Sequence, residues 1–425
     1  MAPPAASRYS LPSASVIHAP LADTAVGRGR WFLVKTDEDA LMDRGTLRPP
    51  GTVPAVSASA STRTRLRQLG FPIGTMDTGP ENAITDVPGV LVGHSTLIHD
   101  EPDVVRTGIT MVVPRADVWT DYVYAGSHIL NGDGEMTGLI WVTESGMLGS
   151  PIGITSTSQV GLVRDFLVAE THRLGVVGGF HLPVVGETWD GWLSTPGSFP
   201  LTNDHAATAL AAAAPGPVAE GSVGGGTGMI CHEFKGGIGT SSRVGTAAGE
   251  AFTVGVLVQA NYGERSDLRV DGVPVGREIG VEVVPSPWRE PPAGGSIITV
   301  PPDGGSIIIV IATDAPLLPV QCRRLAQRAT VGLARVGGYG HESSGDIFLA
   351  FSTANHLGGD REAPLEVRTL PLDSMDPVFH AAADATEEAI VNALCAAQTM
   401  TGRAGHTAPA LPLDLLVEVM GKYRA

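Results

Sequence analysis

Short apolar runs separated by turn residues recur along the chain from residue 63 onward. Runs of this length, bounded by Gly, Pro, Asn, Asp or Ser, are typical of buried strands. We therefore expect strands at 109–113, 138–142, 251–260, 306–312 and 346–351. The run at 306–312 begins with a serine and continues with apolar residues only, so it is long enough to cross the centre of a sheet.

Three longer segments repeat apolar residues at helical spacing. Segment 156–171 begins with residues suited to cap a helix, and segment 318–336 carries an apolar stripe opposite Arg and Gln side chains. Segment 381–397 is the third, and there we expect Glu387 and Glu388 to lie in solvent. Strands mixed with helices in this way favour an α/β fold in which helices cover a sheet.

Composition narrows the class of protein. The chain has 425 residues, of which 43% are hydrophobic and 17% charged, so it can bury a large core. Its formal net charge is −16 and it has no long Lys/Arg run, so we expect neither a nucleic-acid partner nor an anionic membrane partner. No stretch approaches the roughly 20 apolar residues that cross a bilayer, so we expect no membrane anchor.

The first 62 residues differ from the rest and end in a run of small residues. Such runs behave as flexible linkers, so we expect a poorly ordered arm at 1–62 and a single folded domain at 63–425. Residues 1–27 lack a basic segment followed by an unbroken apolar run, so we expect no Sec export. Reduced thiols and a cytoplasmic location are favoured by the small, odd number of widely spaced cysteines, Cys231, Cys322 and Cys395.

The turn before the 306–312 strand ends in Gly304-Gly305-Ser306. Glycine has no Cβ, so the Gly305 carbonyl is open to attack by the hydroxyl of the following serine. An N→O acyl shift would then cut the chain. The freed α-amine of Ser306, with an ordinary pKa of about 7.7 to 8.0, would be the base for its own hydroxyl. The alternative is a plain hairpin turn followed by a buried strand.

A second serine competes with Ser306 for this role. Gly294-Gly295-Ser296 has the same pattern, but it leads only to a Pro-Pro pair. Ser306 opens a strand of sufficient length that runs into a helix-start signal at 313–316. We therefore place the nucleophile at Ser306.

Three further polar residues stand at predicted strand ends. Ser344 and Asp346 lie in or next to a loop that leads into a strand, where they could relay hydrogen bonds to a nucleophile or simply form a turn. Asn261 follows the 251–260 strand, where its amide could stabilise an oxyanion or cap a turn.

A segment with two acids and two tryptophans offers a substrate-binding group. Glu187 beside Trp189 could hold a substrate ammonium, and the alternative is a turn with surface aromatics. His341 raises the possibility of a Ser-His-Asp triad, but a Gly-x-Ser-x-Gly nucleophile elbow is not evident, so we do not favour that arrangement.

The glycine-rich run at 221–239 is not a phosphate loop, because Lys235 is followed by two glycines rather than by Ser or Thr. We expect its backbone to pack closely against a partner chain or a substrate, where Cβ atoms would clash. Cys231-His232-Glu233 lacks the spacing of a metal site. We therefore expect no metal ion and no cofactor.

Taken together, these motifs resemble the family of DmpA-type L-aminopeptidase/D-amidases and β-peptidyl aminopeptidases, over about residues 70–400. The similar stretches are Asn82-Ala83-Ile84-Thr85-Asp86-Val87-Pro88-Gly89-Val90-Leu91-Val92-Gly93-His94, Asn131-Gly132-Asp133-Gly134-Glu135-Met136-Thr137-Gly138, the glycine-rich run at 224–239, Gln259-Ala260-Asn261-Tyr262-Gly263, 306–317, and Ser344-Gly345-Asp346-Ile347-Phe348.

The resemblance implies an αββα four-layer sandwich, called the DOM fold, in a precursor that cuts itself before the nucleophilic serine. Here that means cleavage between Gly305 and Ser306, which would give an α chain at 63–305 and a β chain at 306–425. It also implies a homotetramer of processed αβ units, with no cofactor.

The same resemblance implies roles for single residues. Ser306 would be the nucleophile, Ser344 and Asp346 would support it, and Asn261 would help hold the oxyanion. Glu187 would receive the free amine of a short peptide, amide or ester substrate. A carboxylate left unpaired by a blocked amino end would disfavour blocked substrates, which explains an exopeptidase physically.

One position departs from the family pattern. Some members have tyrosine two residues after the glutamate, where this chain has Trp189, so a hydroxyl is missing and the amino-acid pocket has another shape. Two alternatives to an aminopeptidase therefore stay open at this point. One is a self-processing acyltransferase of the ornithine acetyltransferase type, and the other is a processed but inactive homologue.

Overall fold

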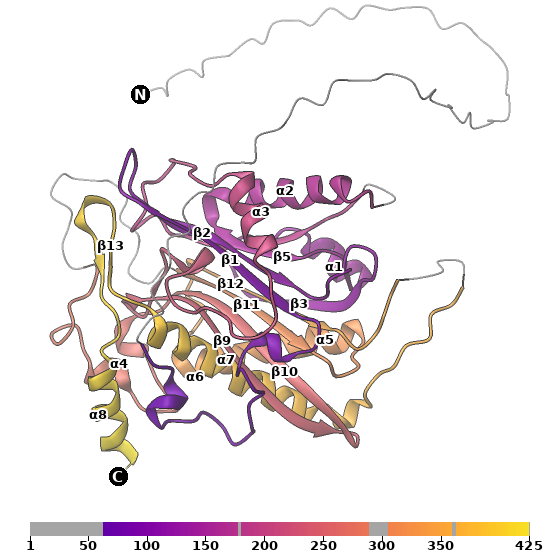
Figure 1. The fold of residues 1–425 in the computed structure, drawn as a ribbon. Coiled ribbons are helices and arrows are strands. Elements are labelled where there is room, and N and C mark those ends of the chain that lie inside the picture. The colour runs from indigo at the N-terminus through magenta and orange to yellow at the C-terminus, as the bar shows by residue number, and fades with distance from the viewer. Residues whose placement is uncertain (1–62, 177–179, 289–304, 359–362, 425) are drawn as a thin grey trace, which may run out of the picture. The chain divides into compact units, whose positions relative to one another are not determined.

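A computed structural model describes residues 63–176, 180–288, 305–358 and 363–424 (Figure 1). It contains two larger β-sheets. The first has the order β1-β2-β5-β6, formed by β1 Leu91–His99, β2 Val105–Val113, β5 Ile152–Ser156 and β6 Val184–Thr188. The second has the order β4-β3-β12-β11-β10-β9, formed by β4 Met147–Leu148, β3 Val123–Gly132, β12 Ser344–Ser352, β11 Gly305–Thr313, β10 Glu250–Asn261 and β9 Gly237–Ala247. The pairs β5/β6 and β11/β12 are parallel, and the other neighbours are antiparallel.

Two short hairpins and several helices complete the described chain. The hairpins are β7 Ile230–Cys231 with β8 Phe234–Lys235, and β13 Met400–Thr401 with β14 Thr407–Ala408. The α-helices are α1 Leu139–Ser145, α2 Val160–Arg173, α3 Asn203–Ala211, α4 Val275–Glu278, α5 Pro319–Ala326, α6 Ala329–Val336, α7 Asp376–Ala396 and α8 Leu413–Arg424. Among these helices, none is both long and apolar enough to span a membrane.

Strand β11 separates two hydrophobic cores. Ile307 and Ile309 face one core, which they share with α5, α6 and α7, whereas Ile308 and Val310 face the other, which they share with strands of the first sheet. Successive side chains of a strand point to opposite faces, so an uninterrupted apolar run fits a strand that is covered on both sides. The prediction of a buried strand at 306–312 is confirmed.

The first sheet has a core of its own on its other face. Ile109 and Met111 of β2 pack there with Val163 and Leu167 of α2 and with Ala206 of α3. Figure 1 shows α2 and α3 on this side of the molecule, and α5, α6 and α7 beyond the second sheet. The strands predicted at 109–113, 251–260 and 346–351 also lie within observed strands.

The strand predicted at 138–142 is wrong, because these residues begin helix α1. Leu139 and Val142 are buried, whereas Ile140 is 90% exposed, which is the one-sided burial of a helix rather than the alternation of a strand. Gly138 and Gly146 take left-handed conformations at the two ends of α1 and terminate it. A short apolar run does not distinguish these two outcomes.

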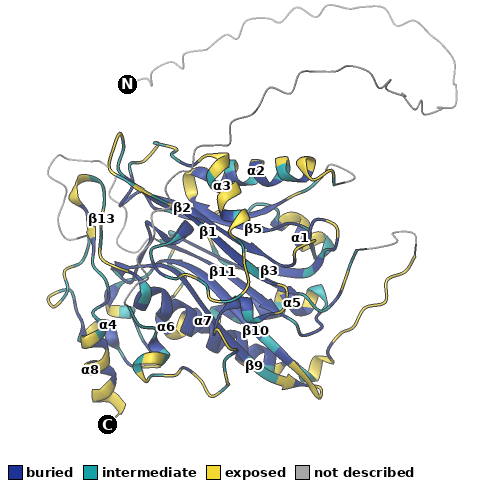
Figure 2. Cartoon of the chain, viewed as in Figure 1, coloured by how far each residue is buried: buried dark blue, intermediate teal, exposed yellow. Residues whose placement is uncertain are grey.

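Three helix predictions also need correction. The stripe at 318–336 belongs to two helices, α5 and α6, rather than one. Glu387 and Glu388 are not in solvent: both are buried, because α7 packs against the second sheet and is covered again by other segments (Figure 2). Helix α2 begins later than predicted, since Ser156 ends strand β5.

Candidate active site

Strand register brings three distant segments of the chain together at Ser306. Ser306 is the second residue of β11, opposite Asn261 at the end of β10 and opposite Gly345 near the start of β12. The end of an antiparallel neighbour and the start of a parallel one meet at the same edge of a sheet. The predicted residues Ser306, Asn261, Ser344 and Asp346 therefore lie at one edge of the second sheet.

The Ser306 hydroxyl points toward the space between the two sheets. Side-chain alternation places it on the same face of β11 as Ile308, which belongs to the core between the sheets. Its oxygen accepts a hydrogen bond from the Gly345 N–H at 3.2 Å, and the residue is 7% exposed. Ser296, the competing serine, lies outside the described residues.

Only glycine fits at the position before Ser306. A Cβ on Gly305 would lie 2.4 Å from the Asn261 carbonyl oxygen and 2.7 Å from the Tyr262 Cα. Contacts this short between a Cβ and backbone do not occur, so the close approach of the β10 end to the start of β11 requires the missing side chain.

Ser344 and Asp346 lie on the other face of the sheet from the Ser306 hydroxyl. Alternation along β12 puts Asp346 on the face of Phe348, which packs with Ile307 in the core shared with α5, α6 and α7. The Ser344 hydroxyl donates to Asp346 Oδ1 at 2.7 Å, and the Ile307 N–H donates to the Asp346 carboxylate. This pair thus contacts the main chain next to Ser306 rather than its hydroxyl.

The Asp346 carboxyl titrates near neutrality. Burial raises its pKa to about 6, and the Ser344 hydrogen bond, the charge of His341 and the Ile307 N–H lower it by less. His341 therefore acts on Asp346 through its charge and is not opposite Ser306 in the strand register, which gives no support to a Ser-His-Asp triad.

Asn261 has a fixed amide orientation. Its Oδ1 accepts the Ile230 N–H at 2.8 Å and its Nδ2 donates to the Trp189 carbonyl oxygen at 3.1 Å. Because one partner is a donor and the other an acceptor, the two ends of the amide are distinguished. Among the described residues, the other Nδ2 hydrogen of Asn261 has no recorded acceptor, and Asn261 is the register partner of Ser306.

Glu187 enters the site from the first sheet, near the end of β6. It is 3% exposed, its Oε1 accepts the Glu135 N–H at 2.8 Å, and its Oε2 accepts the Thr157 hydroxyl. Burial raises the pKa of Glu187 above its ordinary value, the two hydrogen bonds lower it, and the charges of Glu135 and Asp133 raise it. None of the ion pairs recorded for the described residues involves Glu187.

Two glycines connect Glu187 to the neighbourhood of Ser306. A Cβ on Gly134 would lie 2.9 Å from the Gly345 Cα and 3.2 Å from Glu187 Oε1. Gly345 in turn donates its N–H to Ser306. Gly134 thus packs between the Glu187 carboxylate and Gly345, whose N–H donates to Ser306.

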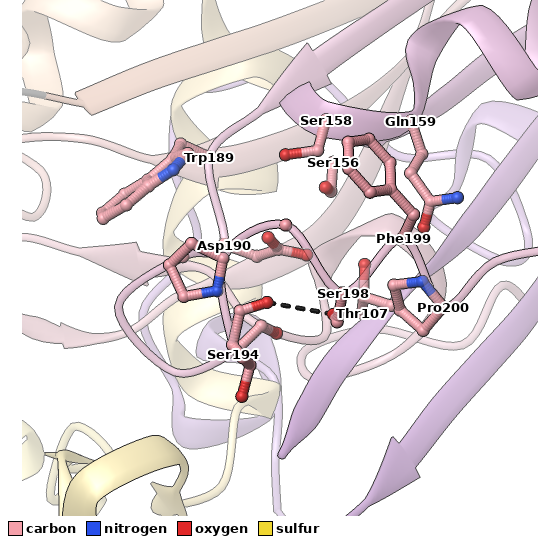
Figure 3. Close-up of a pocket in the computed structure, with 14 residues that line it drawn as sticks. Thr107, Ser156, Ser158, Gln159, Trp189, Asp190, Ser194, Ser198, Phe199 and Pro200 are labelled. Carbon is pink, nitrogen blue, oxygen red and sulfur yellow. Dashed lines mark hydrogen bonds between the residues drawn. The ribbon is translucent and has the colours of Figure 1, made fainter. Parts of the chain in front are cut away.

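Trp189 is one of the residues that line a small pocket (Figure 3). Its indole covers Gly191, where a Cβ would lie 2.4 Å from the ring, and it packs against the apolar cluster of Trp192 and Ile230. The pocket has a volume of about 20 Å³, enough for one water molecule, and Asp190 lines it.

Asp190 and Thr157 are polar residues that sequence reasoning missed. Burial raises the pKa of Asp190 to about 6, and hydrogen bonds to Thr107 and Ser156 lower it by less. Asp190 belongs to the same acidic segment as Glu187, so composition gave a signal. Thr157 gave none, because it is 30 residues from the carboxylate that it contacts.

The glycine-rich run packs against its own chain. A Cβ on Gly225 would lie 2.1 Å from Gln259 Oε1, one on Gly226 would lie 2.4 Å from the Ile238 nitrogen, and one on Gly236 would lie 2.4 Å from the Ala260 carbonyl oxygen. The expectation that these glycines meet a partner chain or a substrate is wrong for these three positions. Among the described residues, no group of three His, Cys, Asp or Glu side chains is placed to hold a metal ion.

Comparison with known proteins relates this site to a family. A model described as peptidase family S58 matches residues 82–408. The β-peptidyl aminopeptidase BapA of Sphingosinicella microcystinivorans is 46% identical over 377 residues, which are 86% of this chain and 94% of that protein.

Two solved structures are similar as well. The β-aminopeptidase of Burkholderia sp. is 48% identical with a TM-score of 0.76, over 84% of this chain and 99% of that one. The L-aminopeptidase D-Ala-esterase/amidase of Ochrobactrum anthropi, described as a prototype of the serine aminopeptidases with a variant of the Ntn hydrolase fold, is 42% identical with a TM-score of 0.76, over 85% and 99%.

These matches extend over most of the chain, and they share a mixed α/β fold of the Ntn-hydrolase type. They do not support the acyltransferase or the inactive alternative. The chain belongs to peptidase family S58, the self-processing N-terminal nucleophile aminopeptidases, and is a hydrolase.

Proposed function

We propose that the chain cuts itself between Gly305 and Ser306 and that the new amino-terminal serine hydrolyses short peptides, amides or esters with a free amino end. The observation that carries this proposal is the register of β10 and β11, which pairs Asn261 with Ser306, while the buried Glu187 carboxylate lies next to Gly134, which packs against Gly345. These three groups supply an oxyanion donor, a nucleophile and an amine acceptor.

Self-cleavage begins with the Ser306 oxygen attacking the Gly305 carbonyl carbon. The bond from that carbon to the Ser306 nitrogen breaks, the nitrogen takes the hydroxyl proton, and an ester joins the two residues. Water then hydrolyses the ester to the Gly305 carboxylate and a free serine. Gly305 leaves the carbonyl unscreened by any side chain.

In the mature enzyme, the α-amine of Ser306 would take the hydroxyl proton while the oxygen attacks the substrate carbonyl. The free Nδ2 hydrogen of Asn261 would bind the oxyanion of the tetrahedral intermediate. A single donor of this kind is worth about 3 to 4 kcal/mol of barrier in enzymes where it has been removed. The leaving amine receives the proton, and water releases the acyl group from Ser306.

Ser344 and Asp346 would hold the nucleophile's main chain and its α-amine rather than its hydroxyl. Their place on the opposite face of the sheet and the bond from the Ile307 N–H to the Asp346 carboxylate support this role. A carboxyl with a pKa of about 6 in this position can also take up or release a proton of the amine near neutral pH.

Glu187 would select substrates by their free amine. A buried carboxylate held only by neutral donors gains a counter-charge when an ammonium binds, and a blocked amino end would leave it unpaired. The relatives include a β-peptidyl aminopeptidase and an L-aminopeptidase D-Ala-esterase/amidase, so we propose β-amino and α-amino ends as the first substrates to compare. Trp189 would form part of the amino-acid pocket.

We further infer that the folded chain has the αββα four-layer arrangement of the DOM fold. One hydrophobic core between the two sheets and one on the outer face of each sheet support this arrangement. Residues 63–425 would then be one catalytic domain. A homotetramer of processed αβ units and a cytoplasmic location are proposed from the family resemblance alone.

Intact-mass measurement of the purified protein tests the proposal directly. We expect two chains, the second beginning Ser-Ile-Ile, and release of amine from an alanine anilide but not from its N-acetyl form. The Ser306→Ala variant should stay a single chain without amidase activity. A folded wild-type protein that is never cut, or an active Ser306→Ala variant, would overturn the assignment.

A further inference from the structure

Lys235 is fully buried at the end of the β7–β8 hairpin, outside the set of groups assigned above. Its Nζ donates to three main-chain carbonyl oxygens, those of Met229 at 2.8 Å, Gly236 at 2.8 Å and Gly226 at 3.2 Å. An ammonium has three hydrogens, and these carbonyls accept all of them. Among the described residues, the ion pairs do not include Lys235, so carbonyl dipoles alone stabilise its ammonium form, and burial lowers the pKa of Lys235 to about 7.

A single peptide bond joins this ammonium to Asn261. The bond between Met229 and Ile230 accepts from Lys235 Nζ through its carbonyl oxygen at 2.8 Å and donates to Asn261 Oδ1 through its N–H at 2.8 Å. The Asn261 amide then presents its remaining Nδ2 hydrogen beside Ser306. The order of groups is thus cation, peptide, side-chain amide and nucleophile.

The hairpin geometry makes this chain of hydrogen bonds rigid. Lys235 and Ile230 are directly opposite each other in the β7–β8 pair, and the Gly236 N–H donates back to the Met229 carbonyl at 2.9 Å. Gly226 and Gly236 have no room for a Cβ, so their carbonyls can converge on the ammonium only because they are glycines. The glycine-rich run therefore has a specific reason for its composition.

We propose that Lys235 is a positioning residue that strengthens the oxyanion donor Asn261 through the Met229–Ile230 peptide bond. A cation on a carbonyl oxygen makes the N–H of the same peptide a stronger donor, and that N–H in turn polarises the Asn261 amide toward its free hydrogen. Such polarisation is large in a water-excluded site. The proposal rests on the proposed function of Asn261.

A double-mutant cycle on the full-length protein tests it, with the four members wild type, Lys235→Met, Asn261→Ala and the double variant. The substrates are the p-nitroanilides of alanine and β-alanine, and rates are normalised to the amount of cut chain found by mass spectrometry. Lys235→Met should lower kcat about 10- to 100-fold and change KM less than about 3-fold. In the Asn261→Ala background it should have no further effect on kcat.

An aminoalkyl boronate, which forms a tetrahedral anion on serine, separates positioning from folding. Lys235→Met should weaken inhibition by the boronate by the same factor as kcat, while binding of a product amino acid stays unchanged. Lys422→Met is the matched control, since Lys422 bonds Glu278 at the exposed surface, and it should behave as wild type. If Lys235→Met does not fold, Lys235→Gln keeps donors without the charge and should still lose kcat.

Two results would overturn the role of Lys235. One is an unchanged kcat in both Lys235 variants, and the other is a pair of losses that multiply in the double variant. Either would leave the proposed function intact as long as Asn261→Ala alone lowers kcat. If Asn261→Ala is as active as wild type, the oxyanion assignment itself fails, and Lys235 fails with it.

Discussion

Two buried glutamates of this protein face opposite electrostatic conditions. Glu388 on α7 accepts from Arg243 at 2.6 Å, from Arg67 at 2.9 Å and from the Asn82 amide at 2.6 Å. Among the described residues, Glu187 in the candidate site accepts a backbone N–H and a hydroxyl and no cation. Both have almost no exposed surface.

The pKa values of the two groups move in opposite directions. Burial alone would raise the pKa of Glu388, but the Arg67 hydrogen bond and the Arg243 charge outweigh it and hold that pKa below its ordinary value. Burial raises the pKa of Glu187, and its neutral donors do not reverse this. Neighbouring cations already balance the charge of the first kind of buried acid, whereas a buried acid without them can gain stability by binding a cation. That difference supports the proposal that Glu388 is structural whereas Glu187 binds a substrate ammonium.

The largest expected effect is on stability. Glu388→Gln leaves two arginines near α7 without their counter-charge, so we expect a loss of about 3 to 5 kcal/mol in the free energy of unfolding. Urea unfolding followed by circular dichroism measures it. The exposed pair of Glu250 and Arg368 gives the matched control, and Glu250→Gln should change stability by less than about 1 kcal/mol. Equal losses in the two variants would remove the distinction.

Glu187→Gln should have the reverse pattern. We expect kcat/KM for free-amine substrates to fall on the order of 30- to 5000-fold, which is about 2 to 5 kcal/mol, because the substrate ammonium loses its buried partner. Stability should be unchanged or higher, since the variant removes a buried charge that has no cation. Steady-state kinetics and urea unfolding of the same preparation check both halves. A destabilised but fully active variant would contradict the comparison.

Acid should affect the two carboxylates at different pH. The pKa of Glu187 is raised above its ordinary value of 4.5. As the pH is lowered, kcat/KM should therefore begin to fall before the pH reaches 4.5, because the carboxylate takes up a proton and stops pairing with an ammonium. The pKa of Glu388 is lowered, so its stabilising contribution is present above about pH 4.5 and is lost as the pH falls through the lower folded value. Activity should therefore decline while the protein stays folded.

Asp346 adds to the acid limb of activity, because burial raises its pKa to about 6. Profiles of kcat/KM against pH for the wild type, Glu187→Gln and Asp346→Asn separate the contributions of Glu187 and Asp346. The free energy of unfolding measured at each pH reports the contribution of Glu388. Simultaneous loss of fold and activity on acidification would count against the assignment.

The smallest effect is expected at Thr157. Thr157→Val keeps the shape of the side chain but removes the hydroxyl that donates to Glu187, so the pKa of Glu187 should rise further. The activation free energy for kcat/KM at neutral pH should increase by about 1.5 to 3 kcal/mol. The acid limb of kcat/KM should move to higher pH in this variant and stay in place in Thr208→Val, whose hydroxyl bonds within an exposed part of α3. An unmoved limb would show that Thr157 does not tune the carboxylate.

The parts of the fold that were predicted correctly depend on local patterns. The apolar run after Ser306 required a strand covered on both faces, and the long segment of α7 had clear helical periodicity. The prediction at 138–142 failed because four or five apolar residues fit either period, and the glycines at both ends decided for a helix. Glu387 and Glu388 were misplaced because periodicity does not reveal what covers the second side of a helix.

The candidate site divides in the same way. Residue type and position at predicted strand ends singled out Ser306, Asn261 and Asp346, and Glu187 was chosen from an acidic segment with two tryptophans. The faces of these side chains were not predicted, since Ser344 and Asp346 approach the main chain of Ser306 and not its hydroxyl. Thr157 was missed, because the carboxylate that it contacts is 30 residues away, and Lys235 was considered only as a phosphate-loop lysine.

The amino-acid sequence by itself determined that a glycine and a serine precede a buried strand and that acids and an amide stand at strand ends. Only the tertiary structure decided that, among the described residues, no cation pairs with Glu187 whereas two pair with Glu388, and that one peptide bond connects Lys235 to Asn261. The physical reason is the distance along the sequence between the residues that determine each property. Strand and helix periods follow from neighbouring residues, whereas the charge state and orientation of a buried group depend on partners that the chain path brings from far away.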